Sequence, residues 1–144
     1  MLSRILKKYS VAEFSSSLSL LLSSGVNVVE ALEISVSSTK DARIKKDLGR
    51  ALELVKEGHP LSRALLNSSI ADPFLLNMIK AGERSGFLSE TLDSALEYYE
   101  EDVDSEVASL ARLVEPLLLL FMGVVVGLMI LSIFLPIVKM AMAV

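Results

Sequence analysis

The chain has 144 residues, a formal net charge of −4 and no cysteine, and 52% of its residues are hydrophobic. This length fits one domain with its own core and excludes two domains of ordinary size. The lack of cysteine excludes a disulfide framework and a thiolate metal site. A mean hydropathy of +0.55 is high for a freely soluble protein and indicates a membrane segment.

The basic residues are concentrated at 40–50 and the acidic residues at 90–106. The basic cluster is short and contains no aromatic residue, so we do not expect nucleic acid as a partner.

The first predicted helix begins at Ser10, where Ser10 and Glu13 form a capping-box pattern. Apolar residues then recur at helical spacing up to Leu22. Gly25 is predicted to end this helix in the left-handed conformation. Residues 1–9 are therefore expected to form a segment that precedes the domain.

A second capping pattern at 27–30 predicts a helix that runs to about residue 38. A third helix is predicted from near Asp41 to Gly58, because the proline that follows disfavours helical geometry in the residue before it. Two shorter helices follow, one over 60–67 and one that begins at Asp72-Pro73, each with proline at its first position.

The segment AGERSGFLSETL, residues 81–92, interrupts the helical pattern. Gly86 is predicted to be the left-handed residue that ends the fifth helix. Gly82 is expected where two backbones approach closely, and Glu83 is expected to accept a hydrogen bond from a neighbouring helix start. Ser89 is expected to cap the sixth helix. On spacing alone, the segment is a sharp helical hairpin.

The sixth helix carries an apolar stripe from Leu88 to Leu110, with acidic residues on its other faces. No segment alternates with the period of a strand. The sequence therefore predicts an all-α fold, an antiparallel bundle of about six helices whose last helix continues into a C-terminal transmembrane helix.

Residues 116–138 contain no charged side chain. As a helix they are about 34 Å long, enough to cross a hydrocarbon core of about 30 Å. Pro116 and Pro136 bracket this span, and Gly123 and Gly127 form a G-x-x-x-G pair on which another membrane helix can pack. The predicted organisation is an N-terminal segment at 1–9, a helical-bundle domain at 10–112, a transmembrane helix at 113–139 and a short tail at 140–144.

The stretch AGERSGFLSETLDSALEYYEEDVDSEV resembles the GE-x-SG-x-L segment of the type II secretion system protein F family. These are inner-membrane platform proteins of type II secretion systems and type IV pili. The positions that match this motif are Gly82, Glu83, Ser85, Gly86 and Leu88.

Other segments resemble the same family in the family's order, over residues 10–140. They are the domain opening FSSSLSLLLSSGVNVVEALEI with Gly25, the turn EGHPLSRAL, and a closing membrane helix with Glu115, Pro116, Gly123, Gly127 and Pro136. Family members usually carry two copies of the domain and three membrane helices. This chain resembles the C-terminal copy with the final helix, so we expect a fragment, a split gene or a reduced paralogue.

The resemblance implies a non-enzymatic inner-membrane platform subunit with its helical domain in the cytoplasm. Such a subunit couples an assembly ATPase to the assembly of pilin-like subunits. The expected partners are that ATPase, pilin-like subunits, other inner-membrane assembly proteins, membrane lipid and further copies of the chain, with no cofactor. Arg112 and Lys139 flank the span one on each side, so charge does not set the orientation.

Two other functions are compatible with a helical domain and one membrane helix. The first alternative is a generic tail-anchored helical adaptor. The second is a small membrane enzyme, which is disfavoured because the single histidine, His59, has no catalytic partners and no phosphate-binding glycine loop accompanies it.

Glu97, Glu101 and Asp104 share one face of the sixth helix. Three interpretations stay open: a solvated face, a hard-cation site that needs oxygen ligands from a second element, and a docking surface for a basic partner. The resemblance favours docking, because platform domains face an assembly ATPase.

Overall fold

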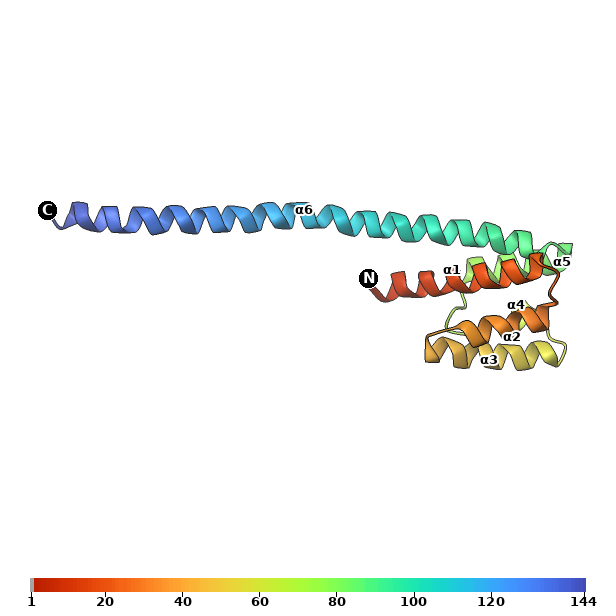
Figure 1. Ribbon diagram of the computed structural model, residues 1–144. Helices are drawn as coiled ribbons and strands as arrows, with labels where there is room; N and C mark the ends of the chain where they lie inside the picture. The colour runs from red at the N-terminus through yellow and green to blue at the C-terminus, as the bar shows by residue number, and fades with distance from the viewer. Residues whose placement is uncertain (1) are drawn as a thin grey trace. The chain divides into compact units, whose positions relative to one another are not determined.

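The computed structural model describes residues 2–144, and within that range it contains six α-helices and no strand (Figure 1). The helices are α1 (Leu2–Ser23), α2 (Val28–Ser38), α3 (Ala42–Lys56), α4 (Leu61–Ala64), α5 (Pro73–Ser85) and α6 (Leu88–Met142). The predicted all-α class with about six helices is confirmed. The chain divides into two units, Met1–Asp104 and Ser105–Val144, and α6 contributes residues to both.

Helix α1 begins at Leu2, so the predicted start at Ser10 is wrong. The Ser10 hydroxyl does not cap the helix but donates to the carbonyl of Leu6 one turn earlier, at 3.0 Å. Tertiary contacts anchor the extra turns. Lys7 donates to the carbonyl of Ala71 at 3.1 Å, and Lys8 forms an ion pair with α6. A local capping pattern is a weak signal where the preceding residues form helix well and have partners.

The ends of the next helices agree with their capping residues. Asn27 accepts a hydrogen bond from the backbone of Glu30 at 3.0 Å, and Asp41 caps α3 through two backbone N–H groups of its first turn, at 2.8 and 3.2 Å. Gly25 and Gly58 follow α1 and α3 with φ of +87° and +98°, a conformation that only glycine adopts without strain. The connections between the first three helices are therefore set locally.

Helix α4 is shorter than the predicted 60–67, and Pro60 is its N-cap rather than its first residue. Turns occupy the following residues. The hydroxyl of Ser68 donates to the carbonyl of Leu65 at 2.7 Å, so it competes with the helical pattern. The carboxylate of Asp47, on α3, accepts from the backbone N–H of Ser69 at 2.9 Å and fastens this turn. Hydrogen bonds from Ser69 hold the pKa of Asp47 below its usual value.

One apolar core joins α1–α5 and the beginning of α6. Each of these helices contributes fully buried side chains, among them Leu18, Leu32, Leu48, Leu61, Leu75, Ile79 and Leu92. In α6 the buried positions are Leu92, Ala95 and Tyr99. The predicted stripe continues to Leu110, but Val107 is 51% exposed. The stripe is therefore buried only over its first half.

Candidate partner interface

The hairpin between α5 and α6 is built around two glycines with different tasks. Gly86 ends α5 with φ of +80°, and its N–H donates to the carbonyl of Gly82 at 2.9 Å. Gly82 is a point of close approach, because a Cβ there would lie 2.7 Å from the Cα of Leu88 and would also press on the Thr91 hydroxyl. Both conformational predictions for these glycines agree with the structure.

Glu83 connects this hairpin to α4. Its carboxylate accepts from the backbone N–H of Leu61 and from the hydroxyl of Ser62 at 2.6 Å, with a longer contact to the N–H of Ser62 at 3.4 Å. It supplies the N-terminal cap that Pro60 lacks. The expected hydrogen bond to a neighbouring helix start is therefore present. Gly82 and Glu83 together fix α5 against α6 on one side and against α4 on the other.

Helix α6 begins at Leu88, two residues before the start that a cap at Ser89 predicts, so Ser89 lies inside the helix and does not cap it. The turn at Gly86 places Phe87 at the helix start, where its carbonyl accepts from the N–H of Thr91 at 3.1 Å. The hydroxyl of Ser85 accepts from the Phe87 N–H at 3.3 Å, and Ser89 donates to Glu90 instead.

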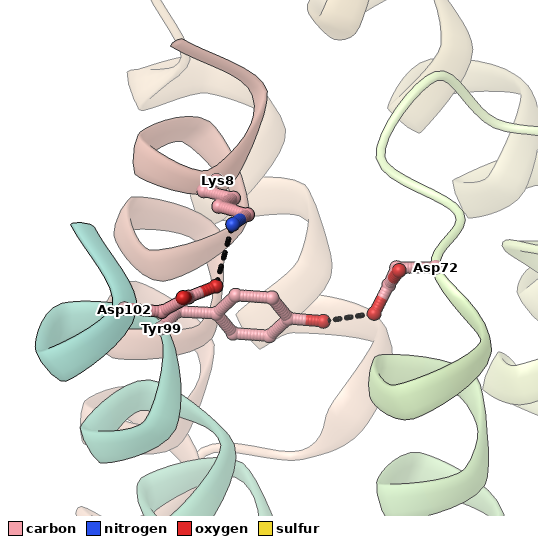
Figure 2. A network of polar contacts seen from close by, with 4 residues as sticks. All are labelled: Lys8, Asp72, Tyr99 and Asp102. Atoms are coloured by element: carbon pink, nitrogen blue, oxygen red, sulfur yellow. Dashed lines mark hydrogen bonds and ion pairs between the residues drawn. The ribbon is translucent and has the colours of Figure 1, made fainter. Parts of the chain in front are cut away.

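A polar network links α1, the start of α5 and α6 (Figure 2). Lys8 pairs with Asp102 at 2.6 Å, and one turn away the Tyr99 hydroxyl donates to Asp72. The same Asp72 oxygen accepts from the N–H of Phe74 at 3.2 Å, which is the cap of α5. Burial, and then the neighbouring Asp72 carboxylate, raise the pKa of Tyr99. Sequence reasoning missed this network because its members lie far apart in the chain.

A groove lies between α1 and α6, lined only by residues of the first unit. Its volume is about 690 Å³. Hydrogen bonds from Ser19 to the carbonyl of Ser89 and to the carboxylate of Asp93, at 3.1 and 2.5 Å, and the pair of Lys8 with Asp102 set the two helices antiparallel. The lining residues are Tyr9, Ala12, Glu13, Ser16, Ser17 and Leu20 of α1 and Leu96, Glu100, Val103 and Asp104 of α6.

The predicted acidic face of α6 is exposed, but only one of its members lines the groove. Glu97, Glu101 and Asp104 are all exposed, and Asp104 meets Glu13 and Glu100 at the groove. Sequence reasoning missed these last two. In residues 2–144, no group of three or more His, Cys, Asp or Glu side chains is arranged to hold a metal ion.

Among the described residues, α6 is the one helix long and apolar enough to cross a membrane, and its most apolar stretch has no covering within the protein. Pro116 and Pro136 lie inside this continuous helix. A Cβ built at Gly123 or Gly127 would meet nothing within 4 Å, so both positions are open to a neighbouring helix. Glu115, beside the first proline, is exposed.

Comparison with known proteins agrees with the resemblance. The family described as "Type II secretion system (T2SS), protein F" matches residues 14–136. Among the relatives, the type IV pilus assembly protein PilC of Thermus thermophilus is 38% identical over 134 residues, which are 92% of this chain and 33% of the relative. The type II secretion system protein F of Pseudomonas aeruginosa is 36% identical over 137 residues, 95% of this chain and 34% of the relative.

The chain spans about a third of the length of these relatives. The family match nevertheless includes most of the helical bundle and most of the apolar part of α6. This chain therefore belongs to the type II secretion system protein F family.

Proposed function

We propose that this protein is a non-enzymatic platform component at the inner membrane of a type II secretion or type IV pilus machine. It couples a cytoplasmic assembly ATPase to the assembly of pilin-like subunits. The observation that carries the proposal is the family match over residues 14–136, which joins a helical bundle to a helix apolar enough to cross a membrane. The names of the relatives, for type IV pilus assembly and type II secretion, support the same role.

In this proposal residues 113–139 span the membrane, residues 10–112 lie in the cytoplasm and residues 140–144 form a tail on the far side. The supporting observation is that large apolar side chains of this segment are exposed in the protein by itself, for example Leu119 at 69% and Phe121 at 63%. Such a surface is stable only in lipid or against other apolar helices. The orientation is tested with single cysteines introduced at residue 30 or residue 143. In intact cells, a thiol reagent that does not cross the membrane is expected to label the cysteine at 143 and not the one at 30.

Co-purification from native membranes tests the role as a whole. A tagged chain is extracted in mild detergent and its bound proteins are identified. We expect an assembly ATPase, pilin-like subunits and other inner-membrane assembly proteins. Recovery of the membrane-inserted chain with unrelated proteins only, together with normal pili and secretion after deletion of its gene, overturns the proposal in favour of a tail-anchored adaptor.

The proposed membrane contact uses Gly123 and Gly127. Bare backbone at these positions allows a second copy of the chain, or a pilin-like helix, to approach closely. Gly123→Leu is expected to reduce crosslinking in membranes while the bundle stays folded. The matched control is Val124→Leu, on a neighbouring face. Crosslinking that is equal in both variants removes this role from the glycines.

The proposed ATPase contact uses the exposed carboxylates of Glu97, Glu101 and Asp104. Charges at the rim of an interface raise the rate of encounter and the specificity more than the affinity. Reversal of all three charges is expected to lower ATPase recovery, whereas reversal of the exposed Glu33 and Glu53 serves as the control. If the ATPase is recovered equally with the triple variant and with the control, the three residues form only a solvated face.

A further inference from the structure

Helix α1 exposes a column of side chains that its own bundle does not cover. The exposed positions 6, 9, 13, 16 and 20 are spaced by three and four residues, so they lie along one face. Leu6, Tyr9 and Leu20 on this face are 61, 60 and 68% exposed. Apolar residues at this spacing are typical of a helix surface that packs against another helix.

The groove between α1 and α6 includes much of this face. Five of its lining residues are small or apolar and are called its floor below: Ala12, Ser16 and Ser17 on α1, and Leu96 and Val103 on α6. From residue 9 to residue 20 the groove extends about 16 Å along α1, which equals three turns of helix. Small side chains on the floor allow a second backbone to come close. This length matches one short stretch of α-helix.

The charge of the groove has one sign. Glu13, Glu100 and Asp104 line it, and no Lys or Arg is among its lining residues in the described part of the chain. The nearby Lys8 is engaged with Asp102. Three carboxylates beside an apolar floor favour an occupant that has cationic side chains next to an apolar stripe.

We propose that this groove binds one amphipathic α-helix of a partner protein, with Leu- or Met-type side chains on the floor and Lys or Arg beside the three carboxylates. An anionic membrane surface is disfavoured by the same carboxylates. A second copy of α1 is disfavoured because it adds Glu13 to a site that is already acidic. A second copy of α3 carries basic residues, but its apolar face is buried at Leu48, Ala51 and Leu52. This proposal does not depend on the platform function proposed above.

The test uses the full chain in nanodiscs of zwitterionic lipid and two designed helical peptides of about five turns. Both peptides have the same leucine stripe, flanked by lysine in one and by glutamate in the other. Fluorescence anisotropy is measured against empty nanodiscs. We expect the lysine peptide to bind at least about tenfold more tightly than the glutamate peptide, and its binding to weaken at high salt. Equal binding of the two peptides overturns the proposal.

Two variants locate the binding. Ser16→Trp fills the groove from an exposed position, and the double reversal E13K/E100K changes the sign of its charge. Each is expected to weaken binding of the lysine peptide at least about tenfold. The reversal E30K/E33K, outside the groove, is the matched control and is expected to leave binding unchanged. If the Ser16→Trp variant binds the lysine peptide as tightly as the unaltered chain does, the proposal is wrong. It is also wrong if the unaltered chain self-associates and Ser16→Trp makes it a monomer, because the groove then binds a second copy of the chain.

Discussion

Leucines of the helical bundle and leucines of the apolar segment differ in what covers them. Leu18 and Leu32 have no exposed surface, whereas Leu118 and Leu120 are 58 and 66% exposed. Burial of apolar surface contributes about 25 cal/mol per Å², and in residues 2–104 the bundle itself supplies that cover. In residues 105–144 the cover has to come from outside the chain. Apolar side chains therefore form a core in the first unit, whereas in the second unit they require an apolar surrounding from outside the chain.

Glycines follow the same division. In the first unit geometry requires glycine at four of five positions: φ is positive at Gly25, Gly58 and Gly86, and a neighbouring backbone is close at Gly82, whereas Gly49 has neither constraint. In the second unit Gly123 and Gly127 have ordinary helical geometry and empty surroundings. On an apolar helix such a pair leaves room for a second helix to approach closely, and this difference from Gly82 can be tested by substitution.

The largest expected effect separates the two kinds of leucine. Leu18→Ala leaves a cavity in the bundle and is expected to lower the free energy of unfolding by about 2–5 kcal/mol. Leu120→Ala is expected to change it by less than about 0.5 kcal/mol. Urea unfolding in mild detergent, followed by tyrosine fluorescence, reports on the first unit alone, because Tyr9, Tyr98 and Tyr99 all lie there. Equal losses in the two variants contradict the division into units.

The next effect separates two kinds of helical glycine. Gly82→Ala places a Cβ against the backbone of Leu88 and is expected to cost about 1–3 kcal/mol of bundle stability. Gly49→Ala, in α3 with nothing within 4 Å, is the matched control and is expected to stabilise the bundle by up to about 1 kcal/mol. The same unfolding measurement compares them, and a neutral Gly82→Ala removes the close approach as the reason for this glycine.

Removal of the Glu83 carboxylate tests the link from α5 to α4. Glu83→Ala leaves the backbone N–H of Leu61 and the hydroxyl of Ser62 without their acceptor, at an expected cost of about 1–3 kcal/mol. Glu83→Gln retains one acceptor oxygen and is expected to cost less. Glu33→Ala, at an exposed position of α2, is the control for loss of a surface carboxylate. If Glu83→Ala is no less stable than Glu33→Ala, then α4 does not need the cap that Glu83 supplies.

The smallest effect concerns Tyr99. Tyr99→Phe loses the hydrogen bond to Asp72, at about 1 kcal/mol near neutral pH. The raised pKa of Tyr99 also predicts that stability falls as pH rises above about 10, because the unfolded chain ionises this phenol before the folded protein does. Unfolding by circular dichroism over alkaline pH is expected to show a shallower fall in Tyr99→Phe. Parallel profiles for both proteins contradict a protected phenol.

The features that could be predicted from the sequence are those in which neighbouring residues decide the outcome. Gly25 and Gly86 lie at positive φ as predicted, the third helix ends before Gly58, and Asn27 and Asp41 cap their helices. The start of α1 could not be predicted locally. The pattern at Ser10 is a valid cap by itself, but the contacts of Lys7 and Lys8 with distant segments favour a longer helix.

The candidate interface could be predicted only in part. The acidic face of α6 is visible in the sequence, but its meeting with Glu13 depends on the antiparallel arrangement of two helices at opposite ends of the bundle sequence. One signal was present. Leu6, Tyr9 and Leu20 follow a second apolar spacing beside the core stripe of α1, which indicates a helix with two packing faces.

Helix α5 and the first turns of α6 are fastened at both ends. Close backbone contact at Gly82 joins them at the hairpin, and Asp72 receives the Tyr99 hydroxyl at the far end. Neither helix can detach without release of both fastenings, so the pair constitutes one cooperative unit of local unfolding. Amide protons of α5 are therefore expected to exchange with solvent at the same slow rate as those of residues 92–99, and more slowly than those of the single-turn α4.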